Sequence, residues 1–211
     1  MQIWLQKWKS VTEEKEFIKS LVFAFLFLLI SLYINFIAGT YATERASLAV
    51  TDIILSNTKA LDVDGIFIYG PIVLFTFVTI LFLHEPKKLP FTLKSIALFT
   101  VIRSVFISLT HLGPFLTQTT VASGNLISKF TFGGDLFFSG HTGIPFLMAL
   151  IFWQNKTLRY VFLVYSFFMG TVVLLGHYHY SIDVLAAFFI TYTIFHITEF
   201  LFKKDRNTFS S

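Results

Sequence analysis

The chain contains no cysteine and few charged residues. Only 13% of its 211 residues are Asp, Glu, Lys or Arg, whereas a soluble domain usually carries about 25%. The lack of cysteine excludes disulfides, thiolate metal ligands and a cysteine nucleophile, but it leaves the redox compartment open. Apolar residues make up 55% of the chain, so the composition predicts one integral membrane domain.

Several common signals are missing as well. No Walker phosphate-binding loop is present, so a nucleotide donor is not expected. We find no internal repeat and no low-complexity segment, and the first apolar run is too long for a cleavable signal peptide. The formal net charge of +4 does not indicate nucleic-acid binding, because the Lys and Arg residues cluster between apolar runs.

Six apolar runs predict an all-α membrane protein with six transmembrane helices, at residues 20–43, 65–83, 95–111, 139–153, 160–175 and 182–202. Residues 1–19 carry Trp4, Trp8 and Val11 at helical spacing between lysines, which favours an interfacial amphipathic helix over a frayed polar tail. The expected organisation is this helix, a catalytic membrane domain at 20–202 and a basic tail at 203–211.

Two segments between the runs also carry predictions. Residues 46–55 are interrupted by Asp52 and are too short to cross a membrane, so we expect a surface or re-entrant helix there. Residues 84–94 contain Pro86 and Pro90 and are expected to form a loop. The polar stretch 117–135 is long enough to fold over a site as a lid.

The distribution of Lys and Arg predicts the orientation. Twelve of the 16 basic residues lie at the two ends of the chain and in the loops after the second and fourth runs. Three lie in the opposite loops, and Arg103 lies inside the third run. The positive-inside rule therefore places both termini in the cytoplasm. The loops around His141 and His179 then face the exoplasmic side, which is periplasmic, extracellular or lumenal.

Two short phrases on that face carry the candidate chemistry. One ends in Ser139, Gly140 and His141, and the other begins at His179 and contains Asp183. A carboxylate four residues after a histidine can fix its tautomer and leave the second ring nitrogen as a nucleophile or base. A histidine on the opposite wall could protonate a leaving oxygen. Each histidine taken alone could equally be structural.

Further residues suggest a bound anion. A helix that begins near Gly140 would direct its first amides at the site. Arg103 lies in the middle of a membrane span, where a charge is costly unless it is paired or functional. It could bind substrate phosphate, or it could form an ion pair with Asp62, Asp64 or Glu199. Together these features predict phosphoryl transfer through a phosphohistidine, with a lipid phosphate ester as donor.

The motifs also resemble those of a known family. GDLFFSGHT at 134–142 and HYSIDV at 179–184 are similar to the two signature motifs of the sphingomyelin synthase branch of the type 2 phosphatidic acid phosphatase (PAP2) superfamily. RSVFISLTHLGP at 103–114 resembles the third-span motif of that branch. The resemblance covers about residues 60–200. It implies six transmembrane helices, an exoplasmic active site and a catalytic triad of His141, His179 and Asp183.

The resemblance also suggests substrates. It implies a phospholipid donor and a lipid alcohol acceptor, either ceramide or diacylglycerol, with no cofactor and no metal. The Lys-x6-Arg-Pro motif of the wider superfamily is missing, and Val172 and Val173 stand where it has a Ser-Arg pair. Both differences favour the synthase branch. Asp62 and Asp135 are candidate supporting residues.

Three alternatives remain open at this stage. Water could accept the phosphoryl group, which would make the protein a lipid phosphatase or a phospholipase C-like hydrolase. The His and Asp residues could instead bind a metal such as zinc. The chain could also be a scaffold or a flippase without enzymatic activity. The oligomeric state is not predicted.

Overall fold

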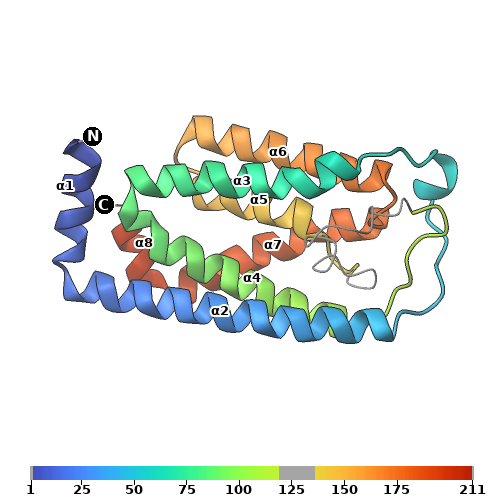
Figure 1. Ribbon diagram of the computed structural model, residues 1–211, viewed down its shortest axis with the longest axis horizontal. Helices are drawn as coiled ribbons and strands as arrows, with labels where there is room; N and C mark the ends of the chain where they lie inside the picture. The colour runs from blue at the N-terminus through green and yellow to red at the C-terminus, as the bar shows by residue number, and fades with distance from the viewer. Residues whose placement is uncertain (1, 119–135, 211) are drawn as a thin grey trace.

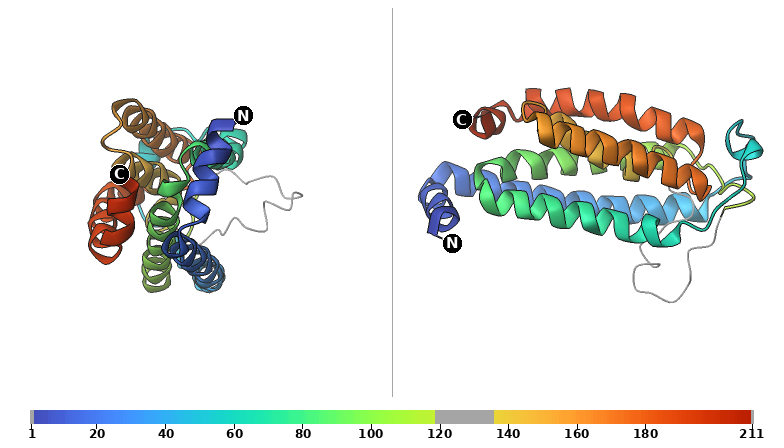
Figure 2. Two further views of the ribbon diagram at one scale, coloured as in Figure 1. Left: turned by 90° about the vertical axis from the view of Figure 1, so that its left-hand side faces the viewer. Right: turned by 90° about the horizontal axis from the view of Figure 1, so that it is seen from above.

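The computed structural model describes residues 2–118 and 136–210, and every regular element in these ranges is helical. The elements are α1 (Gln2–Thr12), α2 (Lys15–Glu44), the short 3₁₀ helix η1 (Leu55–Asn57), α3 (Asp64–His84), the 3₁₀ helix η2 (Pro86–Lys88), α4 (Leu89–Leu109), α5 (Gly140–Ile151), α6 (Lys156–Leu175), α7 (Ser181–Leu201) and α8 (Lys203–Ser210). The long helices run side by side in one bundle (Figures 1 and 2).

Five of the helices described are long and apolar enough to cross a membrane, namely α2, α3, α4 with the preceding η2, α6 and α7. This makes the protein an all-helical, multi-pass membrane protein. On α2 the small residues Ala24, Ser31, Ala38 and Ala42 are buried, and the helix packs lengthwise against α4. Small side chains let two apolar helices approach closely, which is the usual basis of packing in lipid. Most of the large apolar residues of α2 are exposed, with Phe17 as a buried exception.

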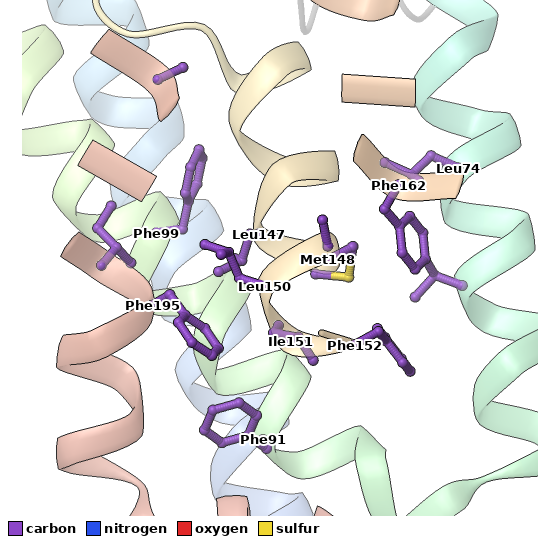
Figure 3. Close-up of a cluster of buried hydrophobic side chains, with 14 of the residues drawn as sticks. Leu74, Phe91, Phe99, Leu147, Met148, Leu150, Ile151, Phe152, Phe162 and Phe195 are labelled. Atoms are coloured by element: carbon purple, nitrogen blue, oxygen red, sulfur yellow. The ribbon is translucent and has the colours of Figure 1, made fainter. Parts of the chain in front are cut away.

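The predicted fourth span is shorter than expected. α5 has 12 residues, which gives a length of about 18 Å, against about 30 Å for the hydrocarbon core of a bilayer. The prediction of six spans is therefore not confirmed. α5 is packed against α4, α6 and α7, and its Leu147, Met148 and Ile151 form the centre of the apolar core (Figure 3).

A glycine allows this close packing. A Cβ atom on Gly143 would lie 2.7 Å from the Phe99 ring and 2.9 Å from Thr191 Oγ1. Both distances are shorter than real Cβ contacts, so only glycine lets α5 lie this close to α4 and α7. The short helix is thereby held inside the bundle, with its first residue at one end of the core.

The prediction of a surface or re-entrant helix at 46–55 is wrong. Residues 46–50 have no regular structure, and only the three-residue η1 follows. The reason is that the backbone of this segment bonds to distant parts of the chain. Ser47 N donates to His111 O at 2.8 Å, and Val50 N donates to the Tyr180 hydroxyl at 3.2 Å.

Two predicted boundaries also change. The loop predicted at 84–94 ends at Lys88, and α4 begins at Leu89. Pro90 stands in the first turn of α4, where a missing amide hydrogen costs no helical bond. The amphipathic helix predicted at 1–19 ends at Thr12, and Lys15 already begins α2.

α1 and α8 lie at the same end of the bundle (Figure 1). α1 is turned across the bundle and is tied to the end of α3, because Trp8 Nε1 donates to Leu83 O at 3.0 Å. The segment 45–63 lies at the opposite end, next to the N-terminus of α7. All the candidate site residues in the described ranges lie in that half of the bundle or in its loops.

Candidate functional site

His179 is fixed mainly by a backbone carbonyl. Its Nδ1 lies 2.8 Å from Leu136 O, and because a carbonyl oxygen only accepts, Nδ1 carries the hydrogen. Nε2 is then the nitrogen with a free lone pair. Asp183 Oδ2 lies 3.5 Å from Nδ1, which is beyond ordinary hydrogen-bond length. The imidazole is thus held with Nε2 as its unprotonated nitrogen and with the Asp183 carboxylate as an electrostatic neighbour.

Asp183 also organises the start of α7. Its Oδ2 accepts a hydrogen bond from Tyr180 N at 2.9 Å, in a reciprocal capping arrangement. The side chain is completely buried. In the part of the chain that the structure describes, Asp183 Oδ1 accepts no hydrogen bond. A buried carboxylate with an unused oxygen is costly, so the position is well suited to stabilise a positive charge on His179.

Arg103 lies on α4 and reaches the segment before α5. Its Nε donates to Phe138 O at 2.9 Å, and the side chain is 9% exposed. The three carboxylates predicted as possible partners have other bonds. Asp64 accepts from the Tyr178 hydroxyl, Asp62 from Asp64 N, and Glu199 from Arg206. The Phe138 carbonyl thus places the guanidinium beside the N-terminus of α5.

Ser139 and Gly140 form that N-terminus. Ser139 is buried, its hydroxyl caps α5 by accepting from Thr142 N, and its own amide donates to Asp183 O at 3.1 Å. A Cβ atom on Gly140 would lie 3.7 Å from Arg103 Nε. This is an ordinary van der Waals distance, so the backbone of Gly140 lies directly beside the guanidinium. We call residues 136–140 the hub, because His179, Asp183 and Arg103 each bond to it or lie against it.

His141 follows the hub in the first turn of α5. Its ring stacks on Phe67, with centroids 4.2 Å apart, and Nε2 lies 3.2 Å from Phe67 O. A carbonyl partner again means that Nε2 carries the hydrogen. Nδ1 is the nitrogen that remains for proton exchange. The second candidate histidine is thus held by α3, on the other side of the hub from α7.

The remaining predicted residues lie elsewhere or are not described. Asp62 is exposed and accepts from the first amide of α3. Asp135 and most of the predicted lid at 117–135 lie outside the described residues. Among the residues described, no group of three or more His, Cys, Asp or Glu side chains is placed to hold a metal ion.

Three contacts around the candidate site were not predicted from the sequence. The carbonyls of Leu136 and Phe138 orient His179 and Arg103. Contacts of this kind cannot be predicted from residue type, because every residue has a backbone carbonyl. Asp52, which was read as a break in an apolar run, bonds to Ser181 at the start of α7. The one sequence signal for this contact was the presence of an acidic residue within an apolar run.

No curated protein and no solved structure matches the chain. Residues 133–200 match one family model, described as PAP2 superfamily C-terminal. The matched range contains the hub, His141, His179 and Asp183, and it spans α5, α6 and nearly all of α7. Over this range, about a third of its length, the chain is similar to the C-terminal part of PAP2 superfamily proteins.

Proposed function

We propose that the protein is a membrane enzyme that transfers the phosphorylated headgroup of a glycerophospholipid to a lipid alcohol. The observation that carries the proposal is the convergence on the hub. His179 and Arg103 bond to carbonyls of Leu136 and Phe138, and Asp183 O accepts from Ser139 N. A candidate nucleophile, a cation and a helix N-terminus thus meet at one short segment, which is the set that phosphoryl transfer requires.

In the first step, His179 Nε2 attacks the phosphorus of the donor. The bond between phosphorus and the glycerol oxygen breaks, and diacylglycerol leaves with a proton supplied by His141. The phosphorylated headgroup then remains on His179. In the second step, the acceptor hydroxyl gives its proton to His141 and its oxygen attacks phosphorus, which breaks the P–N bond and restores the imidazole.

The phosphate lies beside Arg103 and the first amides of α5 in this proposal. An arginine and a helix N-terminus both favour an anion. Gly140 lies next to Arg103 Nε and carries no side chain, which favours close approach of phosphate oxygens to its backbone. The Ser139 hydroxyl is used as a helix cap, so Ser139 contributes to phosphate binding through the position of the turn.

The acceptor is a lipid alcohol, either ceramide or diacylglycerol. The motifs at 134–142 and 179–184 support this choice, because they resemble those of the sphingomyelin synthase branch. Water is far more concentrated than any lipid, so transfer to a lipid requires that the bound acceptor is positioned with a high effective molarity.

The test uses purified protein and phospholipid labelled in its headgroup phosphate, with and without ceramide or diacylglycerol. We expect label to move into a new lipid, at a rate that depends on the acceptor. Release into water at the same rate with or without an acceptor would instead identify a lipid phosphatase or phospholipase C-like hydrolase. No loss of label from any phospholipid would contradict enzymatic headgroup transfer.

We further propose that the hub faces the exoplasmic side of the bilayer and both termini face the cytoplasm. The distribution of Lys and Arg supports this, and α1 and α8 lie together at the end opposite the hub loops. The cysteine-free chain allows a direct test with Ser56→Cys and Asn207→Cys, both at exposed positions. A membrane-impermeant thiol reagent applied from the exoplasmic side should label only the first. Labelling of the second alone would reverse the topology.

A further inference from the structure

The segment 45–63, which we call the strap, crosses the end of the bundle that carries the hub loops. Its apolar side chains Leu48 and Ile53 are more than 80% exposed, so apolar burial of these residues does not hold the strap in place. It is held by the buried Leu55, which packs in a cluster with Leu136 and Tyr180, and by backbone and polar bonds to segments far away in the sequence. Leu61 N, for example, donates to Leu175 O at the end of α6 at 2.8 Å.

A close backbone contact fixes the first part of the strap. A Cβ atom on Gly113 would lie 1.9 Å from Ser47 O, so the segment after α4 passes directly against the strap, where only glycine fits. Next to this crossing, Tyr180 donates its hydroxyl hydrogen to Gly113 O at 2.7 Å and accepts from Val50 N. The buried Tyr180, which directly follows His179, thus links the strap to the segment after α4.

Asp52 is the main anchor of the second part. Its Oδ1 accepts from Ile54 N at 2.8 Å and from Leu55 N at 3.0 Å, which shapes the turn of the strap. Its Oδ2 accepts from both the amide and the hydroxyl of Ser181, each at 2.7 Å. Asp52 is 8% exposed. Burial raises the pKa of its carboxyl, but these four hydrogen bonds outweigh burial and hold the pKa below 3.8.

Ser181 is the first residue of α7, between His179 and Asp183. Two carboxylates therefore share the start of this helix. Asp183 Oδ2 accepts from Tyr180 N, and Asp52 Oδ2 accepts from Ser181 N. Without Asp52, the two donors of Ser181 would lose their acceptor. Asp183, two residues further along α7, has a buried Oδ1 that accepts no hydrogen bond within the described part of the chain. A shift of Asp183 toward Ser181 would change its position relative to His179 Nδ1.

We propose that Asp52 is a positioning residue for the reaction, which acts through Ser181 to hold Asp183 and His179 in register with the hub. This inference rests on the proposed function, because it assumes that His179 is the nucleophile. Asp52 itself touches neither substrate nor phosphate. Because Asp52 accepts both hydrogen bonds from Ser181, Asp183 remains bonded to Tyr180 N and next to the His179 imidazole.

The test compares Asp52→Asn and Ser181→Ala with Glu44→Gln, which removes an exposed carboxylate at the same end of the bundle. Asp52→Asn keeps the size of the side chain but weakens its acceptance of two donors from Ser181. We expect kcat to fall about 10- to 100-fold, since small displacements of catalytic groups have effects of this size. KM should change less than kcat, because the phosphate-binding groups are untouched. Ser181→Ala should show a smaller loss in kcat, and Glu44→Gln none.

Two further measurements separate positioning from unfolding. Asp52→Asn and Ser181→Ala combined should lose less kcat than the product of the single losses, because both remove the same contact. Hydrogen exchange of amides 176–184 should quicken in Asp52→Asn and not in Glu44→Gln. Wild-type kcat in a folded Asp52→Asn protein would overturn the proposal, as would unchanged exchange. If the wild-type protein itself shows no headgroup transfer, the proposed function fails, and the exchange experiment still decides whether Asp52 orders the start of α7.

Discussion

At the end of the bundle that carries α1 and α8, charged side chains pair with one another, whereas at the hub end the described contacts of Arg103, Asp183 and Asp52 include backbone atoms. Lys94 donates to Asp205 Oδ2 at 2.6 Å and to Ser20 Oγ at 2.8 Å, which joins α4, α8 and α2. At the other end of α4, Arg103 donates to Phe138 O. Both cations are almost fully buried in one helix, but their partners differ.

The two buried cations differ in what surrounds them. Lys94 has a carboxylate partner, Asp205, within the fold. Arg103 has the Phe138 carbonyl among its partners and lies beside Gly140, at the positive end of α5. The proposed function uses Arg103 to bind the substrate phosphate and leaves Lys94 a role in stability, and the following experiments test that division.

The largest effect is expected at His179. His179→Ala removes the proposed nucleophile and should lower kcat by at least about 10⁴-fold, as loss of a catalytic triad member does. His196 on the same helix is the matched control, since it is half exposed and pairs with Glu199 toward the other end. His196→Ala should retain near wild-type headgroup transfer. Equal activity of the two variants would show that the hub end is no more important for headgroup transfer than the end with α1 and α8.

Substitutions of the two cations of α4 should have opposite consequences. Arg103→Lys keeps a positive charge but loses the planar fork that matches phosphate. We expect it to lower kcat/KM about 100-fold while the thermal unfolding midpoint changes little.

Lys94→Met is the counterpart. It leaves Asp205 without its cation, and removing one partner of a buried ion pair costs about 3–5 kcal/mol. Thermal unfolding in detergent should show this loss, while the remaining folded protein keeps its kcat. A stable, fully active Arg103→Ala protein would contradict the assignment of Arg103, and an inactive but stable Lys94→Met protein would contradict that of Lys94.

The smallest expected effect concerns pH and His177. This residue lies between two loops of the hub end, with Nδ1 2.6 Å from Thr117 Oγ1 and Nε2 3.3 Å from Thr58 Oγ1. Burial lowers the pKa of His177 below 6.5, and the Asp52 carboxylate offsets part of that change. Because the unfolded chain binds the proton more readily, the stabilising contribution is complete above pH 6.5 and is lost as pH falls toward the folded pKa.

Hydrogen exchange of residues 110–118, corrected for intrinsic rates, measures this effect. We expect protection to decrease as the pH is lowered from about 8 to about 5, and His177→Gln should remove this pH dependence of protection. Protection that increases on acidification would show that protonated His177 is favoured in the fold. The end with α1 and α8 should change much less over the same range, because His177 is remote from it.

The sequence predicted the parts of this structure that rest on side-chain type and periodicity. Long apolar runs predicted α2, α3, α6 and α7 within a few residues. An apolar run of this length in lipid must form a helix, because its backbone hydrogen bonds have to be made within the segment. The polar phrases around His141 and His179 correctly indicated two histidine segments at one end. α5 was predicted too long, because apolar residues buried between helices cannot be distinguished by composition from residues that face lipid.

The other errors and omissions involve hydrogen bonds of backbone groups to distant parts of the chain. Residues 46–55 of the strap were expected to be helical, but strap amides donate to His111 O, to the Tyr180 hydroxyl and to Leu175 O. The orienting role expected of Asp183 is shared with Leu136 O, which is closer to His179 Nδ1. No pattern of residue types reports such contacts, since every residue has a carbonyl group.

The measurement that tests the central claim most directly is the capture of the phosphorylated intermediate. Wild-type protein and His141→Ala are each mixed with a donor labelled in its headgroup phosphate and carrying a good leaving group, then quenched in base and digested. We predict an acid-labile, base-stable label on the peptide that contains His179, present at a higher level in His141→Ala without acceptor and discharged by ceramide or diacylglycerol in the wild type. Headgroup transfer without label on His179, or with label on another residue, would contradict the account.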